Sequence, residues 1–261
     1  METYCYEDRV VIFIDILGFR KWVNNEIDNS GSDCTSIVTV FKFIRKYYAE
    51  QGDEYARTVQ ISFFSDSIII SFEETDADQI FQTVADLQIL ILNLVKRGVL
   101  VRGAISNGKL LHNKEFILGP AFMNAYDLET KKSVVPRVIC DLKVIDAALK
   151  HKHEIDFKED LPYVLDLFDS DFDGQLYIDY FDKIFNIFDT EKQYLEYLVH
   201  LKDIIEQNLE KSEDLNIHGK YLWMKEKFNS VVYKRFSAEI ANKELKDMEV
   251  IKLYDSITLI K

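Results

Sequence analysis

The hydrophobic pattern predicts that the chain begins with a buried strand ending in a carboxylate. Residues 10–14 are all apolar, Asp15 follows them, and Gly18 comes three residues later. An unbroken run of Val, Ile and Phe is typical of a strand buried on both faces. A carboxylate there is costly without a cation, a metal ion or hydrogen-bond donors beside it. Taken alone, Asp15 is more simply a strand-end residue that caps the following turn.

A second pair of apolar runs predicts a hairpin with an aspartate at its tip. The runs 59–64 and 68–72 flank Ser65-Asp66-Ser67, which has the form of a tight turn. If the first strand lies beside this hairpin, Asp15 and Asp66 meet at one end of the sheet. Two-metal phosphoryl-transfer sites are built in this way, with ions about 4 Å apart. The pair of aspartates, rather than either one alone, therefore indicates a candidate phosphoryl-transfer site.

The remaining pattern predicts an α+β fold with a βαββαβ order and helices on one side of the sheet. A loop is expected over 24–36, a mainly helical and more charged region after 141, and long amphipathic helices over 191–209 and 217–240. We therefore expect a ferredoxin-like (palm-type) core over 1–145 and a mainly helical extension over 146–261, packed on that core. The other expected elements are helices through Trp22 and over 38–51, 76–97 and 119–132, and strands over 99–108 and 134–141.

Composition limits the partners and the compartment. Of the 261 residues, 48% are hydrophobic, which is ample for a sizeable core, and the formal net charge is −13. That charge disfavours binding to nucleic acid or to an anionic membrane, so an anionic substrate needs local cations. No apolar run approaches the roughly 20 residues of a membrane span. Three cysteines without metal-ligand spacing predict a reduced, soluble, cytoplasmic protein.

Three further features are candidates for chemistry. Gly18 forms a glycine turn whose backbone N–H groups could hold phosphate oxygens. Arg102 lies in an otherwise apolar strand and either pairs with a core carboxylate or reaches a triphosphate. Residues 169–174 copy the first half of a calcium loop, but its twelfth position is Tyr180 rather than a bidentate Glu. We interpret that stretch as an acidic turn before a strand.

These residues also carry a family resemblance. Phe13-Ile-Asp-Ile-Leu-Gly-Phe19, the hairpin 65–67 and Val101-Arg-Gly-Ala-Ile-Ser-Asn-Gly108 resemble the catalytic domain of class III nucleotide cyclases. More closely, the strand at 102–106, together with residues 119–129 and Pro136-Arg137, is similar to the pyrimidine cyclases of the bacterial Pycsar anti-phage system. The resemblance covers roughly the first 140 residues.

The resemblance implies a head-to-tail homodimer whose active sites lie at the subunit interface. Two Mg²⁺ or Mn²⁺ ions would be held by Asp15, Asp66 and the Ile16 carbonyl. The phosphates would bind to the backbone of Ile16–Phe19, which includes Gly18. Arg102 would reach the β-phosphate. The 3′-hydroxyl of the substrate would attack its own α-phosphate and release pyrophosphate.

Two positions depart from the purine-reading pattern of the family. Purine cyclases carry a Lys shortly before the hairpin aspartate and an Asp before the Gly-x-x-x-Asn helix, and these positions are Ser62 and Phe116 here. Selection of adenine or guanine therefore has no visible basis. We take Ser62 and Phe116 as candidate base-binding residues.

A second departure concerns the transition state. The family helix carries an Asn and, four residues later, an Arg, but the matching positions are Met123 and Asp127. Arg137 is the candidate catalytic substitute, with Lys131 and Lys132 as alternatives.

These inferences together predict a metal-dependent pyrimidine nucleotide cyclase. It would convert UTP, favoured over CTP, to the 3′,5′-cyclic monophosphate (cUMP or cCMP) as a second messenger in anti-phage defence. One alternative is a palm-type nucleotidyltransferase that makes oligonucleotides, although such palms usually carry adjacent Asp residues on the hairpin and here Ser65 and Ser67 flank a lone Asp66. The other alternative is a degenerate nucleotide-binding module without catalysis.

Overall fold

The computed structural model describes residues 3–31, 33–49, 58–75, 77–151, 166–236 and 247–261. The chain divides into two compact units. The first comprises Met1–Leu94 and Val99–Ile178, and the second comprises Val95–Gly98 and Asp179–Lys261. Each unit is described separately.

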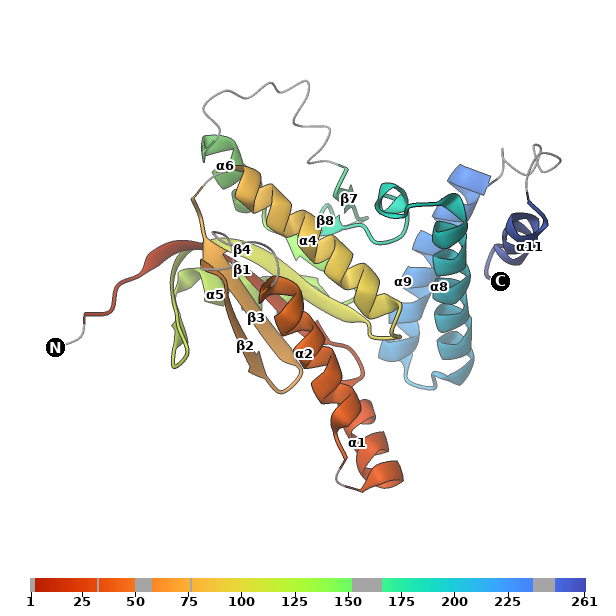
Figure 1. The fold of residues 1–261 in the computed structure, drawn as a ribbon, viewed down its shortest axis with the longest axis horizontal. Coiled ribbons are helices and arrows are strands. Elements are labelled where there is room, and N and C mark those ends of the chain that lie inside the picture. Colours follow the sequence, from red (N-terminus) through yellow and green to blue (C-terminus); the bar gives the residue numbers. More distant parts are fainter. Residues whose placement is uncertain (1–2, 32, 50–57, 76, 152–165, 237–246) are drawn as a thin grey trace. The chain divides into compact units, whose positions relative to one another are not determined.

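The first unit is built on one sheet with the strand order β2-β3-β1-β4-β6-β8-β7, and β5 pairs with β4 off this path (Figure 1). Only the β4–β6 pair is parallel among these described strands. The strands are β1 (Glu7–Ile16), β2 (Gln60–Phe64), β3 (Ser67–Glu73), β4 (Val101–His112), β5 (Ile117–Leu118), β6 (Val138–Cys140), β7 (Phe168–Ser170) and β8 (Leu176–Ile178).

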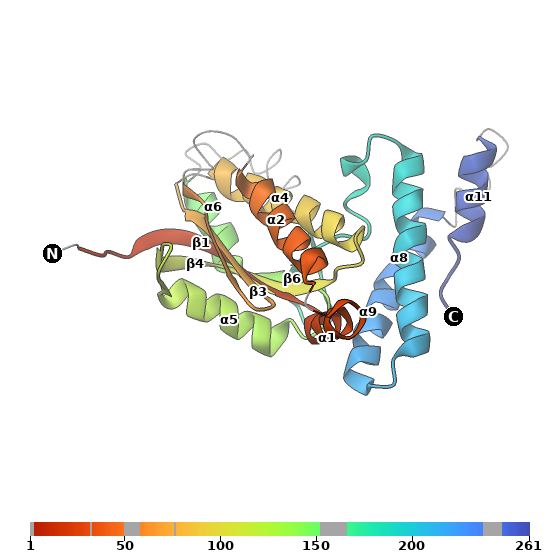
Figure 2. The same cartoon turned by 60° about the horizontal axis from the view of Figure 1, so that its bottom comes forward.

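The helices of this unit complete the βαββαβ order predicted from the sequence, and the α+β fold class is confirmed. They are α1 (Phe19–Ser30), α2 (Thr35–Ala49), α4 (Ala77–Val95), α5 (Pro120–Lys132) and α6 (Leu142–His151). The expectation of helices on one side only is wrong. Helices α2 and α4 cover one face of the sheet, whereas α5 lies across the other (Figure 2).

Burial on both faces explains the unbroken apolar run of β1. Val11 and Phe13 pack in a cluster that includes Ala121 of α5. Ile12 and Ile14 alternate with them along the strand and therefore lie on the opposite face, and both are fully buried. A strand between two helical layers needs apolar side chains at every position.

The stretch expected to form a loop over 24–36 is mostly helical, because α1 continues to Ser30 and α2 begins at Thr35. Gly31 ends α1 with a positive φ (73°), and its N–H donates to the Ile27 carbonyl. Polar residues on a surface helix carry little of the apolar periodicity that marks a helix in sequence.

The sheet continues beyond the domain boundary expected at residue 145. Strands β7 and β8 form a hairpin, and β8 pairs with β6 through Ile139–Tyr177 and Cys140–Leu176. The first compact unit therefore ends at Ile178. The acidic stretch 169–174 lies at the β7–β8 turn, as predicted.

The second unit is helical. It contains α8 (Glu191–Lys211), α9 (Leu215–Val231), a π-helical turn over Val232–Phe236, and α11 (Met248–Ser256). Asp214 caps α9 by accepting hydrogen bonds from the backbone N–H groups of Asn216 and Ile217. The expected helix over 217–240 is thus present as α9 and the π-helical turn, and its last residues lie outside the described residues. Among the helices that the structure describes, none has both the length and the apolar character needed to cross a membrane.

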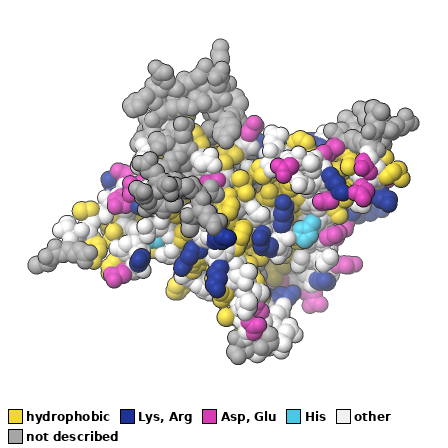
Figure 3. All heavy atoms as spheres, in the orientation of Figure 1, with side chains coloured by type: hydrophobic (Ala, Val, Ile, Leu, Met, Phe, Trp, Pro, Cys, Tyr) yellow, Lys and Arg dark blue, Asp and Glu magenta, His cyan; other side chains and the backbone are white. Residues whose placement is uncertain are grey.

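The net charge of −13 does not make every surface acidic. On the face drawn in Figure 3, Lys and Arg side chains gather in the middle. Local cations are therefore available on the chain for an anionic ligand.

Candidate active site

The fold places Asp15 and Asp66 at the same end of the sheet. Asp15 is the next-to-last residue of β1 and pairs with Ser67, the first residue of β3. The backbone N–H of Ile16 donates to the Asp66 carbonyl over 3.0 Å, which holds the hairpin turn against the end of β1. Burial raises the pKa of the Asp15 carboxyl, and the negative charge of Asp66 raises it further. The two carboxylates therefore form one electrostatic unit.

Arg102 is the counter-charge of this unit. It is the direct cross-strand partner of Asp15 in the β1–β4 pair. Its Nε donates to Oδ2 of Asp15 over 2.9 Å and lies 2.8 Å from Oε1 of Glu129. Of the two interpretations open from the sequence, pairing with core carboxylates is observed. The Arg102 side chain keeps 25% of its surface exposed, so it remains accessible to a ligand.

Glu129 was not predicted from the sequence. It lies on α5 at a four-residue spacing from Ala121 and Ala125, and all three are buried. Burial is the main cause that raises the pKa of its carboxyl, while Arg102 lowers it and Asp15 and Asp66 raise it. Its Oε1 accepts no hydrogen bond within the described part of the chain. The helical spacing of a Glu behind two buried alanines was the signal that could have identified it.

The two aspartates suit a divalent cation. Carboxylate oxygens are the ligands preferred by Mg²⁺ and Mn²⁺, and the raised pKa of Asp15 marks negative charge that a cation would compensate. Among the described residues, no group of three or more His, Cys, Asp or Glu side chains could hold a metal ion. Asp15 and Asp66 alone supply two carboxylates, so a ligand set here would also need a backbone carbonyl, for which Ile16 is the expected donor.

The N-terminus of α1 provides backbone donors beside the aspartates. Gly18 is the N-cap residue of α1 and has the left-handed conformation (φ 74°). In the described structure, no side chain caps this end of the helix with a hydrogen bond. The N–H groups of Ile16 and Leu17 already donate to the Asp66 and Leu100 carbonyls. The amides open to an anion therefore begin at Gly18 and continue through Phe19 into the first turn.

The two candidate base-binding residues lie in different surroundings. Ser62 lies on β2, and its Oγ is 3.0 Å from Nε2 of His112. Phe116 lies between β4 and β5, is 42% exposed, and makes an edge-to-face ring contact with Tyr4. That contact joins Phe116 to the N-terminal segment rather than to the aspartates.

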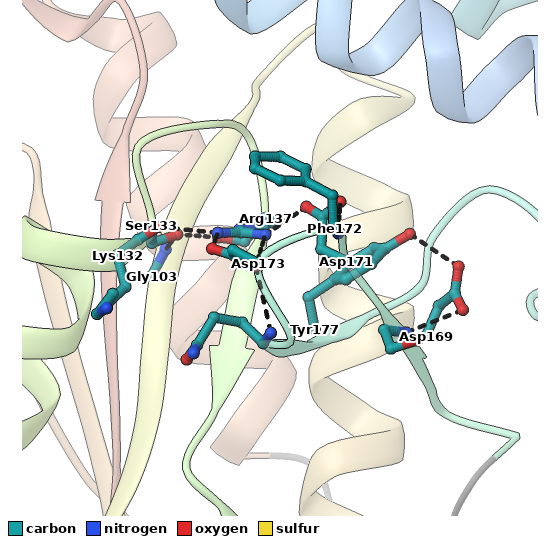
Figure 4. Close-up of polar contacts among 11 residues, drawn as sticks. Gly103, Lys132, Ser133, Arg137, Asp169, Asp171, Phe172, Asp173 and Tyr177 are labelled. Atoms are coloured by element: carbon teal, nitrogen blue, oxygen red, sulfur yellow. Dashed lines mark hydrogen bonds and ion pairs between the residues drawn. The ribbon is translucent and has the colours of Figure 1, made fainter.

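Arg137 is not brought to the aspartates; it is buried in an ion-pair network (Figure 4). Its Nη1 donates to Asp171, its Nη2 donates to Asp173 over 2.6 Å, and Nη2 also donates to the Lys132 carbonyl over 2.9 Å. The acidic turn singled out in the sequence thus supplies the counter-charges of Arg137. This placement departs from the expected catalytic role and assigns Arg137 to joining the β7–β8 hairpin to the rest of the sheet.

The alternatives to Arg137 are on the surface of α5. Lys131 pairs with Asp127 over 2.8 Å, with both side chains more than half exposed. Met123 is 67% exposed. These side chains face away from the buried Glu129 side of the helix, so within one copy of the chain they do not join the carboxylate cluster.

No protein-family model and no curated protein matches this sequence. Solved structures with a similar fold include a guanylyl cyclase domain from Blastocladiella emersonii (15% identity, 67% of this chain and 96% of that chain, TM-score 0.41). They also include the adenylyl cyclase CyaB from P. aeruginosa (14%, 68% and 94%, 0.41). A third is an adenylate/guanylate cyclase/hydrolase from Silicibacter pomeroyi (13%, 66% and 95%, 0.41). These likenesses are too distant to transfer a function.

Proposed function

We propose that this chain is a metal-dependent nucleotide cyclase that converts a pyrimidine nucleoside triphosphate to its 3′,5′-cyclic monophosphate and pyrophosphate. The observation that carries the proposal is the Asp15–Asp66 pair, held at one sheet end by the Ile16–Asp66 backbone hydrogen bond and placed directly before the N-terminus of α1. A carboxylate pair beside a helix N-terminus combines a cation site with an anion site. A nucleoside triphosphate with its divalent cations offers the complementary charges.

The triphosphate would bind where α1 begins. The amides from Gly18 through Phe19 donate to phosphate oxygens, and the helix dipole favours the negative charge. The first turn of α1 contains no acidic residue, and Arg20 and Lys21 are exposed there. These cations offset the acidic balance of the rest of the chain and attract the substrate locally.

The cation site would be formed by Asp15, Asp66 and the Ile16 carbonyl. When bound there, two Mg²⁺ or Mn²⁺ ions would supply the charge that makes the 3′-oxygen nucleophilic and stabilises the leaving pyrophosphate. Asp15 must be ionised to take part. Its raised pKa makes this ionisation depend on the compensating charge beside it.

The reaction replaces the phosphoanhydride linkage between the α- and β-phosphates by a phosphoester linkage to the 3′-oxygen. The 3′-oxygen forms a bond to the α-phosphorus, the 3′-hydroxyl proton is released, and the bond from the α-phosphorus to the bridging oxygen breaks. That oxygen leaves with pyrophosphate. The chain's part is to hold the triphosphate and the ribose in line and to bind the charge that develops on the leaving group.

Arg102 would bind the leaving phosphates. In the structure its guanidinium contacts both Asp15 and Glu129. A cation held by Asp15 weakens the first contact, while Glu129, which is almost fully buried, retains the second. Arg102 can then turn toward the β-phosphate without losing its anchor, and a guanidinium suits phosphate oxygens through its fixed fork of donors.

The base preference and the biological role rest on the sequence resemblance. Ser62 and Phe116 replace the purine-reading pair of the related cyclases, which supports a pyrimidine substrate, with UTP ahead of CTP. The resemblance further supports a homodimer that makes a cyclic nucleotide signal in the cytoplasm during anti-phage defence. In such a dimer the exposed residues of α5, Lys131 and Lys132 among them, can act on the nucleotide of the partner subunit.

Incubation with each of ATP, GTP, CTP and UTP in Mn²⁺, with products identified by mass, tests the proposal. A cyclic pyrimidine monophosphate with equimolar pyrophosphate is expected. A cyclic purine monophosphate as sole product would refute the base assignment, and linear oligonucleotides would identify the palm-type nucleotidyltransferase. Nucleotide binding by calorimetry without pyrophosphate release in any metal would identify the module without catalysis.

A further inference from the structure

A stack of three phenylalanine rings connects α1 with the hairpin that carries Asp66. The ring centres of Phe19 and Phe41 lie 6.1 Å apart with an interplanar angle of 14°, and those of Phe41 and Phe63 lie 5.0 Å apart at 27°. Phe19 is the first residue of α1, Phe41 lies on α2, and Phe63 lies on β2. Aromatic pairs at such distances attract each other beyond the area that they bury. The stack therefore joins three elements, with Phe41 as its central ring.

The two outer rings belong to the two halves of the proposed site. Phe19 directly follows Gly18, and its backbone N–H is one of the amides proposed to bind phosphate. Phe63 lies three residues before Asp66, in the strand that leads into the hairpin turn. The ring of Phe41 thus lies between the start of the anion site and the strand that leads to the cation site.

The first turn of α1 has few other anchors among the described residues. Residues 19–29 are all half-buried or exposed, and no side chain caps the start of this helix in the described structure. The Trp22 ring lies 6.3 Å from that of Phe19, and its Nε1 donates to Oγ of Ser36 on α2 over 2.9 Å. A helix without a buried face depends on such single contacts for its position. The position of the phosphate-binding amides therefore depends on α2.

Helix α2 is a firm support for the stack. Its residues Ile44 and Tyr48 are fully buried. Phe41 and Arg45 are one helical turn apart, so they lie on the same side of α2. The guanidinium carbon of Arg45 lies 5.2 Å from the centre of the Phe63 ring, and a cation over an aromatic face is attracted by the ring. Phe63 is therefore held by both a ring and a cation of α2.

We propose that Phe41 is a positioning residue of the cyclase reaction, whose ring holds the start of α1 at a fixed distance from the hairpin that carries Asp66. This inference rests on the proposed function and deepens it. Phosphate oxygens bound at Phe19 and cations bound at Asp66 act on the same triphosphate. A displacement between them moves the α-phosphate out of line with the 3′-oxygen, and a displacement of about 1 Å can reduce the rate about 100-fold.

The first test measures steady-state kinetics in Mn²⁺ with the nucleoside triphosphate that the wild-type chain cyclises. Phe41→Leu keeps an apolar side chain and removes both ring pairs. It should lower kcat about 10- to 100-fold with KM little changed, because each half of the site still binds its part of the triphosphate and only the transition state needs both in line. Phe41→Tyr keeps the ring and should recover most of the lost rate. Phe43→Leu is the matched control and should keep the wild-type kcat, since Phe43 is a half-buried residue of the same helix whose ring contacts Tyr47.

The second test observes the start of α1 directly and needs no substrate. A chain labelled with 5-fluorotryptophan gives one fluorine resonance for each of its two tryptophans, and Trp22→Phe assigns them. Trp22 lies beside Phe19 in the first turn of α1, whereas Trp223 is buried in the second unit. In Phe41→Leu the Trp22 resonance should shift or broaden. The Trp223 resonance should keep its position and show that the second unit remains folded.

The outcomes separate this inference from the proposed function. An unchanged kcat or an unchanged Trp22 resonance in Phe41→Leu would refute the positioning role while leaving the cyclase proposal intact, as would an equal loss of rate in Phe43→Leu. If Phe41→Leu does not fold, Phe63→Leu, at a half-buried residue of the edge strand β2, takes its place in both tests. Absence of turnover in the wild-type chain would refute the proposed function, and the fluorine spectra would still decide whether Phe41 holds the start of α1.

Discussion

Nε of Arg102 lies 2.9 Å from Oδ2 of Asp15, across the β1–β4 pair in which the two residues are direct partners. Under the proposed function, a divalent cation would bind the same carboxylate, so Arg102 and the cation would compete for Asp15. A triphosphate bound with the cation would resolve this competition by providing Arg102 with new acceptors.

The first prediction concerns the aspartates. Asp15→Asn and Asp66→Asn should each reduce cyclisation by about 10³-fold or more, since each removes a charged ligand while keeping the side-chain shape. The rate of pyrophosphate release in Mn²⁺ measures this effect.

Asp8→Asn is the control, because Asp8 is an exposed aspartate on β1 that pairs only with exposed Lys109 among the ion pairs described. Wild-type turnover in either Asp15→Asn or Asp66→Asn would remove the basis of the proposed function.

The second prediction uses the raised pKa of Asp15. A carboxyl whose pKa is higher in the folded than in the unfolded state destabilises the fold when ionised. This cost is absent below the ordinary pKa of 3.8, grows as pH rises toward the folded-state pKa, and is complete once the carboxyl is ionised in the folded state. Asp15→Asn should therefore increase the free energy of unfolding at pH 7.5, and the gain should shrink as pH falls toward 4. Urea unfolding across this range measures it; a variant less stable than wild type at pH 7.5 would contradict the argument.

The third prediction concerns Glu129 as the anchor of Arg102. Glu129→Gln removes the second negative partner of the guanidinium, so Arg102 should hold Asp15 more tightly against a cation. The apparent affinity for Mn²⁺, measured by calorimetry without nucleotide, should fall about 10-fold. Glu115→Gln, at an exposed carboxylate, should leave the affinity unchanged. Unchanged Mn²⁺ affinity in Glu129→Gln would show that Glu129 serves packing alone.

Features that depend on neighbours along the chain could be predicted from the sequence. The positions of Asp15 after an apolar run and of Asp66 at a hairpin tip are of this kind, and their meeting follows from strand pairing. The contacts of Arg137 could not be predicted in this way, because its partners Asp171 and Asp173 are more than thirty residues away along the chain. Likewise, the side chains of Arg9, Ser71, His112 and Ser62 are joined by hydrogen bonds across four strands. These contacts leave no spacing pattern in the sequence.

The fourth prediction follows from the burial of Arg137. Arg137→Met should reduce the free energy of unfolding by about 3–5 kcal/mol, because it removes the buried guanidinium that pairs with the buried Asp171. Lys131→Met is the matched control, since it breaks an exposed ion pair with Asp127 and should cost at most about 1 kcal/mol.

Adding Asp171→Leu to Arg137→Met should recover part of the loss, because the buried negative charge that Arg137 paired with is then gone as well. If Arg137→Met instead abolished turnover at wild-type stability, Arg137 would return to the catalytic machinery.

The last prediction concerns assembly. Phe64 at the hairpin tip is 78% exposed, and Met123 and Tyr126 on α5 are 67% and 49% exposed. All three lie in the first unit, and the resemblance matches Met123 to the Asn that the family helix carries. Light scattering should give twice the chain mass of 30.6 kDa. Met123→Glu should shift the mass toward one chain and reduce turnover in parallel, because a charge in an apolar interface must be desolvated without a partner. Leu215→Glu, at an 86% exposed residue of the second unit, should change neither. A wild-type mass of one chain at the concentration where turnover is full would refute the homodimer.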